Sequence, residues 1–256
     1  MSIRLVVFDW AGTLVDFGSR APVIAFLEAF DAAGLPITEA VARGPMGAHK
    51  RDHVREILQR PDVADRLPPA LAALDPAERV ERLYAAFTDR LLEVLPSHAR
   101  PIDGVPQALA ALRARGIAVA SGSGYTRAMM DRLEPAARAA GLDPGPVICA
   151  DELPQGRPAP WALFRLAERF GVYPMAEVLK VGDTPADIAE ARQAGARCVA
   201  LTACGNEVGL APSDWQALAP AQQARHRARA RERLAGAEAW LDSVAELPGW
   251  IDAHGA

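Results

Sequence analysis

Lysine is nearly missing from this chain of 256 residues. Of the 28 lysines and arginines only Lys50 and Lys180 are lysines, and the other 26 are arginines. Arginine can fill almost any surface or ion-pairing role, but only a lysine amine readily loses its proton and condenses with a carbonyl. The scarcity therefore favours a chemical role for at least one of the two lysines. The alternative is that codon bias left two lysines behind by chance.

Cysteines and long apolar runs are also scarce. The three cysteines lie far apart without CxxC spacing, which excludes a typical zinc site and favours small core residues in a reducing compartment; they are Cys149, Cys198 and Cys204. No span approaches the roughly 18 apolar residues of a membrane helix, and the first residues lack the apolar run of a secretory signal. We therefore expect a cytoplasmic protein without a membrane partner.

An excess of positive charge is absent as well. The net charge is −4, which gives no general attraction to nucleic acid or to an anionic membrane. Five arginines between Arg225 and Arg233 lie two residues apart, so on a helix they would spread around its circumference. We expect a solvated helix there and no nucleic-acid partner.

The first apolar segment of the chain ends in a carboxylate. Leu5 to Phe8 are apolar, Asp9 follows, and a Gly-Thr turn comes three residues later. A buried parallel strand ends in this way, with its carboxylate delivered to the crevice above the sheet. An aspartate at that position can attack phosphorus or hold a divalent cation, although it can also simply cap a turn.

The remaining pattern predicts an α/β fold. Helices are expected at residues 21–30, after Thr38, at 46–60 and from Asp75-Pro76 onward, so residues 18–98 are all helical. Strands are expected at 117–120, 147–150, 178–181 and 198–201, with helices between them. This alternation predicts a doubly wound parallel sheet with a helical insertion after the first strand. The core would comprise 1–17 and 99–256, and the insertion 18–98.

One lysine belongs to an apolar helical stripe. Met46, Lys50, His53 and Ile57 follow at spacings of four, three and four, which places them on one face of a helix over 46–60. A lysine in that position is partly desolvated, and desolvation favours the neutral amine. The alternative is a lysine that reaches solvent at the edge of a core helix.

Three later segments of the chain could bring polar residues to the same edge of the predicted sheet. Ser121 to Arg127 form a small-residue loop that could bind phosphate, and Arg157 lies in a loop stiffened by two prolines. Asp183 and Asp187 follow the strand over 178–181, where carboxylates suit Mg²⁺.

This ordered set resembles the haloacid dehalogenase superfamily of phosphotransferases. The resemblance spans the chain and implies a Rossmann-like core with a helical cap domain at 18–98. Phosphatases of the superfamily carry a second aspartate two residues after the nucleophile, which protonates the departing alkoxide. Ala11 occupies that position here, so simple phosphomonoester hydrolysis is not expected.

Longer strings are similar to the phosphonatase family, the phosphonoacetaldehyde hydrolases. They are Ala11, the segment Gly44–His53 containing Lys50, the segment Gly124–Arg127, and Gly156–Trp161 with Arg157 in place of a more usual lysine. The resemblance implies cleavage of phosphonoacetaldehyde to acetaldehyde and phosphate, a Mg²⁺ requirement, and a homodimer joined through the caps.

The same resemblance implies roles for individual residues. Lys50 would form an imine with the aldehyde and Asp9 would take the phosphoryl group, with His53 as proton carrier and Met46 beside it. Mg²⁺ would bind Asp9, the carbonyl of Ala11 and Asp183, supported by Asp187. The phosphate and substrate contacts would come from Ser123, Gly124, Tyr125 and Arg157, although Ser121 could replace Ser123. Burial, Arg51 and the cation would lower the pKa of Lys50, and Lys180 would be structural.

Three other functions stay open at this point. A 2-haloacid dehalogenase also lacks the second aspartate but needs neither metal nor imine. A sugar-phosphate phosphatase or mutase would turn over phosphate esters. A catalytically inactive binding protein of the same fold would be expected to have lost Asp9, Lys50 or Asp183, and all three are present.

Overall fold

The computed structural model describes residues 2–254 and contains one six-stranded sheet. Its strands are β1 (Leu5–Phe8), β2 (Ala118–Ser123), β3 (Val147–Cys149), β4 (Val178–Gly182), β5 (Arg197–Leu201) and β6 (Ala239–Leu241). All neighbouring pairs are parallel, in the order β3-β2-β1-β4-β5-β6. The connection changes direction beside β1, and open sheets bind ligands beyond the carboxyl ends of the strands at such a reversal. The predicted doubly wound parallel sheet is confirmed.

Helices cover both faces of this sheet. They are α7 (Val105–Ala114), α8 (Arg127–Ala139), α9 (Trp161–Phe170), α10 (Pro185–Ala194), α11 (Pro212–Ala217), α12 (Pro220–Arg233) and α13 (Leu247–His254), with 3₁₀ turns η2 (Ala150–Glu152), η3 (Met175–Glu177) and η4 (Val244–Glu246). Val6 and Phe8 belong to the core that α7, α8 and α13 cover, whereas Leu5 and Val7 pack against α9. Because side chains alternate along β1, burial on both faces requires its unbroken apolar run.

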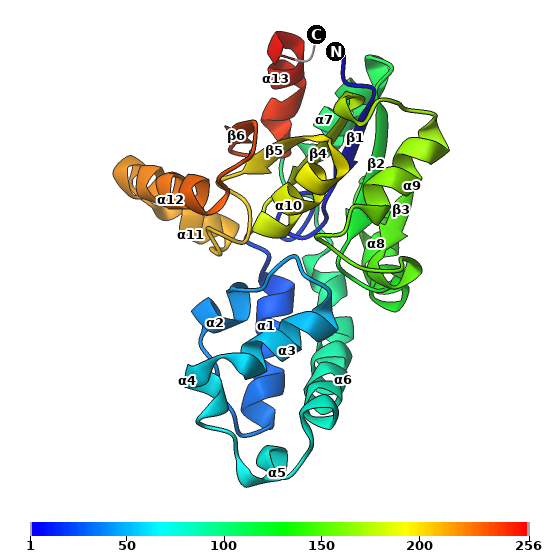
Figure 1. Ribbon diagram of the computed structural model, residues 1–256. Coiled ribbons are helices and arrows are strands. Elements are labelled where there is room, and N and C mark those ends of the chain that lie inside the picture. The colour runs from blue at the N-terminus through cyan, green and yellow to red at the C-terminus, as the bar shows by residue number, and fades with distance from the viewer. Residues whose placement is uncertain (1, 255–256) are drawn as a thin grey trace.

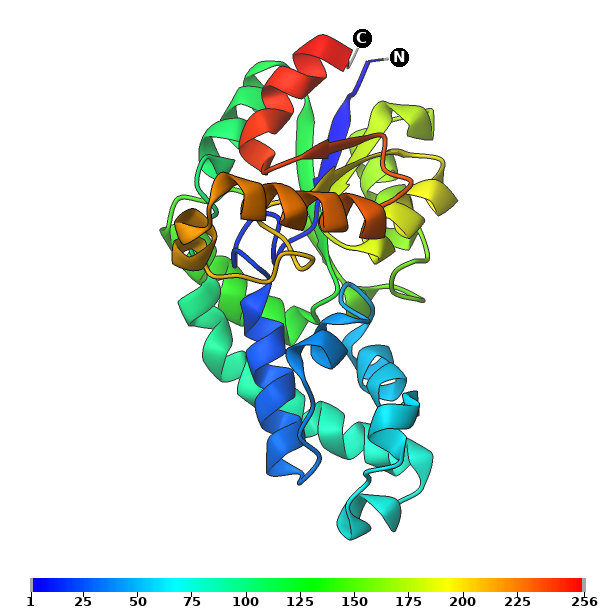
Figure 2. The ribbon, with the colours of Figure 1, turned by 90° about the vertical axis from the view of Figure 1, so that its left-hand side faces the viewer.

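The helices between β1 and β2 lie together beyond the carboxyl ends of the strands (Figure 1). They are α1 (Arg20–Ala32), α2 (Glu39–Arg43), α3 (Lys50–Gln59), α4 (Pro61–Ala64), α5 (Pro69–Ala72), α6 (Pro76–Val94) and the 3₁₀ turn η1 (Leu95–His98). We call this segment the helical insertion. The long helices α1 and α6 pack side by side (Figure 2). The rings of Phe26 and Phe87 stack between them with centroids 4.0 Å apart.

The helical insertion begins and ends where local sequence signals indicate. Thr38 caps α2 by accepting a hydrogen bond from the Val41 N–H, as expected. Asp75 and Glu78 form a capping box at the start of α6, with Pro76 in the first turn. The buried side of α6 carries Val80, Leu83, Phe87 and Leu91. The exact division of the chain at residues 17/18 and 98/99 stays a prediction.

Two element boundaries differ from the prediction by three or more residues. The predicted helix over 46–60 starts only at Lys50, because Gly44 to Gly47 form turns and Gly47 has a φ of +90° that a helix does not allow. The strand expected at 117–120 continues to Ser123, since Ser121, Gly122 and Ser123 pair with β3. The short strand β6 was not predicted at all. Within residues 2–254, the helices are all too short or too polar to cross a membrane.

Candidate active site

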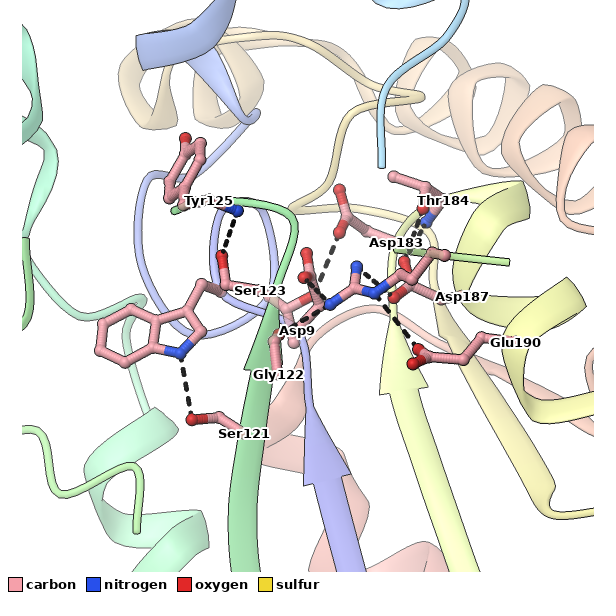
Figure 3. Close-up of polar contacts among 12 residues, drawn as sticks. Asp9, Ser121, Gly122, Ser123, Tyr125, Asp183, Thr184, Asp187 and Glu190 are labelled. Atoms are coloured by element: carbon pink, nitrogen blue, oxygen red, sulfur yellow. Dashed lines mark hydrogen bonds and ion pairs between the residues drawn. The ribbon is translucent and has the colours of Figure 1, made fainter. Parts of the chain in front are cut away.

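Four chain segments meet at the carboxyl edge of the sheet (Figure 3). Asp9 follows β1, Ser123 ends β2, Arg157 comes from the loop before α9, and Asp183 follows β4. The helical insertion closes the space above them, and a pocket lies between, lined by Asp9, Ala11, Ser19, Pro22, Met46, Gly47, Lys50, Ser123, Gly124, Tyr125, Arg157 and Thr184. Eight of the predicted site residues therefore share one pocket. His53, Asp183 and Asp187 do not line it.

Lys50 brings a buried amine into this pocket. The residue is 4% exposed, and its Nζ lies 3.6 Å from Met46 Sδ and 5.6 Å from the centre of the Tyr125 ring. Within residues 2–254 it forms no ion pair with a carboxylate. Burial lowers the pKa of Lys50 to about 8, with Arg157 adding to the effect and Asp9 opposing it. Because the amine is buried and faces the pocket, the alternative of a lysine reaching solvent is wrong.

The arginine that helps to lower the pKa of Lys50 is not the one expected from the sequence. Arg51 extends away from the site, where its Nε lies 2.8 Å from Glu81 and its guanidinium lies over the Tyr84 ring. Arg157 lowers the pKa of Lys50 instead. The prediction for Arg51 was wrong because successive residues at a helix start point in different directions.

Arg157 is held by three carboxylates. Its Nη2 lies 2.7 Å from Asp9 Oδ1, its Nη1 2.8 Å from Asp187 Oδ1 and its Nε 3.2 Å from Glu190 Oε2. Nη2 also donates to the Gly122 carbonyl at 2.7 Å. Although burial opposes the charge, these carboxylates raise the pKa of Arg157. The arginine therefore stays charged and fixes the orientation of the Asp9 carboxylate.

The second lysine completes this charged cluster from below. Lys180 is fully buried, with its Nζ 3.1 Å from Asp187 Oδ1 and 3.3 Å from Glu190 Oε2. Burial and Arg157 act to lower the pKa of Lys180, but the net shift is upward because of the two carboxylates and Asp9. Lys180 is thus a protonated structural partner, in contrast to Lys50.

Three buried carboxylates form a possible cation site. Asp9, Asp183 and Asp187 each offer an oxygen within 4.8 Å of the others. Asp183 accepts hydrogen bonds from Thr13 Oγ1 at 3.1 Å and from the Asn206 N–H at 2.7 Å, but no cationic side chain of residues 2–254 pairs with it. Burial, followed by repulsion from Asp9 and Asp187, raises the pKa of Asp183 well above its usual value. A divalent cation would relieve this repulsion, so the donor set fits one.

The two candidate serines have different surroundings. Ser121 is fully buried and its Oγ accepts a hydrogen bond from Trp10 Nε1 at 3.0 Å. Ser123 lines the pocket, and its Oγ accepts from the Tyr125 N–H at 3.1 Å (Figure 3). Only Ser123 is placed to contact a bound ligand, since Ser121 supports the packing beneath.

His53 lies behind the pocket lining. Its ring packs against Phe26 with centroids 4.1 Å apart, and its Nε2 lies 2.8 Å from the Ala42 carbonyl oxygen. Burial, together with Lys50, lowers the pKa of His53 well below its usual value, so the imidazole is neutral. Its role as proton carrier stays a prediction.

Several residues of the site were not predicted from the sequence. Glu190 could have been found, because it follows Asp187 by three residues on α10 and so lies on the same face. Trp10 and Thr13 follow Asp9 closely in the chain, but only the fold shows that Thr13 contacts Asp183 and that Trp10 contacts Ser121. Asn206 follows β5 and carries no local signal of its contact with Asp183.

Known proteins resemble this chain over nearly its whole length. The sequence model of haloacid dehalogenase-like hydrolases matches residues 3–195. A phosphonoacetaldehyde hydrolase of Bacillus cereus is 38% identical over 96% of this chain and 94% of its own length. The chain belongs to the phosphonoacetaldehyde hydrolase family of the haloacid dehalogenase-like hydrolases. The predicted family and the predicted class of enzyme are therefore confirmed.

Two further members of the family agree with this placement. A phosphonoacetaldehyde hydrolase of Hahella chejuensis is 40% identical, over 98% of this chain and 86% of its own length. The crystal structure of a phosphonoacetaldehyde hydrolase-like protein from Oleispira antarctica superposes with a TM-score of 0.92 at 36% identity, covering 98% of this chain and 92% of that one. The Rossmann-like core and the helical insertion are thus the fold of this family.

Proposed function

We propose that this enzyme hydrolyses the C–P bond of phosphonoacetaldehyde, releasing acetaldehyde and phosphate. The observation that carries the proposal is the buried Lys50 amine, which lines one pocket with Asp9 and has no carboxylate partner among residues 2–254. Its relatives named phosphonoacetaldehyde hydrolase support the choice of substrate.

Lys50 makes the carbon a possible leaving group. The neutral amine attacks the aldehyde carbon, and uptake of one proton with loss of water gives a protonated imine. When the C–P bond breaks, its electron pair moves into the imine and forms an enamine, which avoids a free carbanion. A pKa of about 8 leaves about a tenth of the amines neutral at pH 7, compared with about 3 in 10,000 for an ordinary lysine.

Asp9 accepts the phosphoryl group. Its carboxylate, oriented by Arg157, attacks phosphorus and forms an aspartyl phosphate. Because no alkoxide leaves in this step, no acid is needed at position 11, and Ala11 lines the pocket there. The enamine is then protonated, hydrolysis of the imine releases acetaldehyde, and water cleaves the aspartyl phosphate.

The remaining residues bind and orient the phosphonate. Ser123, the Gly124 N–H and Arg157 would hold phosphoryl oxygens, while Tyr125 and Met46 would pack beside the two-carbon chain. Mg²⁺ would be held by Asp9, the Ala11 carbonyl and Asp183, with Asp187 hydrogen-bonded to Thr184 in support. The cation would supply positive charge that offsets repulsion between the nucleophile and the phosphonate.

A trapping experiment tests the mechanism. Incubation with phosphonoacetaldehyde and Mg²⁺, followed by borohydride, should reduce the imine to a stable adduct on Lys50, mapped by digestion and mass spectrometry. Lys50→Arg should lose both the adduct and phosphate release. Lys180 in the same digest should remain unmodified, and Arg55→Lys, which adds a lysine at an exposed ion pair with Asp52, controls for nonspecific reductive amination.

The outcomes separate the rival functions. Phosphate release without any adduct would mean that Lys50 is structural. Turnover of 2-haloacids that survives chelation and Lys50→Ala would establish a dehalogenase, and turnover of phosphate esters would establish a phosphatase or mutase. No turnover of any of these would favour the inactive binding protein.

We also propose the assembly and location that the family resemblance implies. The helical insertion would act as a cap over the pocket and join two copies into a cytoplasmic homodimer. Light scattering after size exclusion tests the assembly: a mass near twice 27.2 kDa is expected, and a monomer at micromolar concentration would contradict it.

A further inference from the structure

One arginine of the helical insertion reaches into the sheet-bearing part of the protein. Arg43 ends α2, and its side chain is only 15% exposed. Its Nη1 donates to the Gly18 carbonyl at 2.9 Å and to Asn206 Oδ1 at 3.3 Å, and its Nη2 donates to the Gly209 carbonyl at 3.0 Å. The guanidinium thus connects α2 with the segment before α1 and with the loop after β5.

The approach of this guanidinium to the loop is unusually close. A Cβ built on Gly209 would lie 2.8 Å from Arg43 Cζ, and Gly209 has a φ of +70°, where a side chain would be strained. Asn206 is 3% exposed and returns a hydrogen bond from its Nδ2 to the Arg43 carbonyl at 3.4 Å. Arg43 and Asn206 therefore each donate a hydrogen bond to the other. Both bonds form only when the helical insertion is packed against the loop after β5, which we call the seating of the insertion.

Asn206 also contacts the candidate cation site. Its backbone N–H donates to Asp183 Oδ2 at 2.7 Å. The preceding residue is Gly205, and a Cβ at that position would overlap the Asp183 side chain. The loop after β5 therefore fixes one oxygen of Asp183, while Arg43 fixes the loop.

The same stretch of the insertion carries the imine lysine. The turn containing Met46 and Gly47 follows Arg43 and leads into Lys50, seven residues after Arg43, at the start of α3. The group that would bind the aldehyde and the carboxylate that would bind the cation are thus joined through Arg43 and Asn206.

We propose that Arg43 and Asn206 are a positioning pair, through which seating of the helical insertion and occupancy of the cation site by a divalent cation favour each other. Because coupling between two binding equilibria is reciprocal, loss of the pair weakens cation binding even without substrate. The inference rests on the proposed function only for the roles of Lys50 and Asp183.

A purely structural role would have a different signature. Arg43 also lies 3.6 Å from Glu39 one turn earlier, and an arginine that only stabilised α2 would change the unfolding temperature but not the affinity for Mg²⁺. Asn206→Ala isolates the coupling, since it removes the side chain facing Arg43 but keeps the backbone N–H that binds Asp183.

The experiment measures Mg²⁺ affinity by calorimetry without substrate. We expect Arg43→Lys and Asn206→Ala each to weaken binding at least about fivefold, the lower end of typical coupling. The double variant should be little weaker than either single variant. Arg55→Ala should bind Mg²⁺ like the parent. Arg55 is an exposed arginine of the helical insertion, and among residues 2–254 it pairs only with Asp52 of the same helix.

The results distinguish this inference from the proposed function. Affinities of both variants within twofold of the parent would overturn the positioning pair, whatever the activity. A parent that binds Mg²⁺ but releases no phosphate from phosphonoacetaldehyde would overturn the proposed function and leave the comparison of affinities valid. Limited proteolysis adds a second readout: Mg²⁺ should protect the parent near Gly18 more than Asn206→Ala, and equal protection would contradict the inference.

Discussion

Two lysines in one protein illustrate how neighbouring charges decide the behaviour of a side chain. Lys180 and Lys50 are both buried, but Lys180 contacts Asp187 and Glu190 whereas Lys50 contacts a thioether and an aromatic ring. The pKa of Lys180 is raised and that of Lys50 is lowered to about 8. Burial penalises both charges, so the carboxylates account for the difference.

The Lys50 pKa predicts a pH dependence. In the proposed mechanism the neutral amine attacks the aldehyde, so kcat/KM should rise about tenfold per pH unit below pH 8 and level off above it. A cation bound near Asp9 would move this limb to lower pH. The measurement is kcat/KM between pH 6 and 9.5 at saturating Mg²⁺. A rate that still rose tenfold per pH unit up to pH 9.5 would show that the pKa of the lysine is not lowered, and a flat profile would show that its deprotonation does not limit the reaction.

The lowered pKa of Lys50 also affects the free energy of unfolding. An ion pair would raise the pKa of a lysine and stabilise its charged form, whereas burial of Lys50 destabilises the charged form. The unfolded chain holds the Lys50 proton up to about pH 10.5, whereas the folded chain releases it near pH 8. Below pH 8 the folded state therefore bears the cost of a buried charge, and this cost is relieved as the pH rises from 8 to 10.5.

Much of the site at residue level could be predicted from the sequence. Asp9 and Ser123 could be predicted because they follow or end strands, and Lys50 because it lies in a segment similar to the family. All three line the same pocket. Arg51 was assigned wrongly and Asn206 was missed, since the direction of an exposed arginine and the path of a loop depend on tertiary packing.

At the scale of elements, the turn between α2 and α3 decides how closely the insertion approaches the sheet. Gly47 has a φ of +90°, and a Cβ there would lie 2.4 Å from Thr184 Oγ1 and 3.0 Å from Ala186 Cβ. Thr184 and Ala186 lie at the start of α10, so this glycine allows the turn to rest directly on that helix.

We predict that Gly47→Ala separates these two elements. The overlap should displace the turn and Lys50 with it, lowering kcat/KM at least about tenfold. Gly141→Ala is the matched control, because its φ of +92° gives the same backbone strain, about 1–2 kcal/mol, with no atom within 4 Å of the added Cβ. Steady-state kinetics and urea unfolding of both variants check this. Equal kcat/KM in the two variants would contradict it.

The element boundaries show where sequence patterns stop being informative. The spacing of Met46, Lys50 and Ile57 fits a helix, yet Met46 reaches Lys50 from a turn. Ser121 and Gly122 have low strand propensity, but pairing with β3 keeps them in β2. In both places tertiary contacts override the local preference.

At the scale of the whole molecule, the sheet order brings together groups that are far apart in the chain. Strand β1 is central, so the loops after β1, β2 and β4 meet above it. The alternation of strands and helices was sufficient to predict a doubly wound parallel sheet, but the order of its strands was not predicted. The short β6 was not predictable, because three residues with partly exposed side chains carry no distinct pattern.

Cation binding should stabilise the whole fold. As proposed, Mg²⁺ would bind only the assembled site, so saturating Mg²⁺ at 100 times its Kd should add about 2.7 kcal/mol to the free energy of unfolding. Asp183→Asn should abolish this gain. In chelator at pH 7 the variant should be no less stable than the parent, because the raised pKa of Asp183 means that its charge opposes folding above pH 3.8.

Differential scanning calorimetry with and without Mg²⁺ measures this effect. Asp103→Asn is the control, since Asp103 is an exposed carboxylate paired with Arg100 and its loss should leave the Mg²⁺ effect unchanged. A full Mg²⁺ stabilisation in Asp183→Asn would place the cation elsewhere.

The scarcity of lysine makes this protein unusually selective toward amine-directed reagents. Lys180 is sealed and protonated, so Lys50 is the one lysine that an acylating probe can reach at mildly alkaline pH. A small fluorogenic ester would therefore label the pocket itself. Protection of that label by a ligand would report occupancy of the pocket directly, so inhibitors could be screened by competition without following turnover.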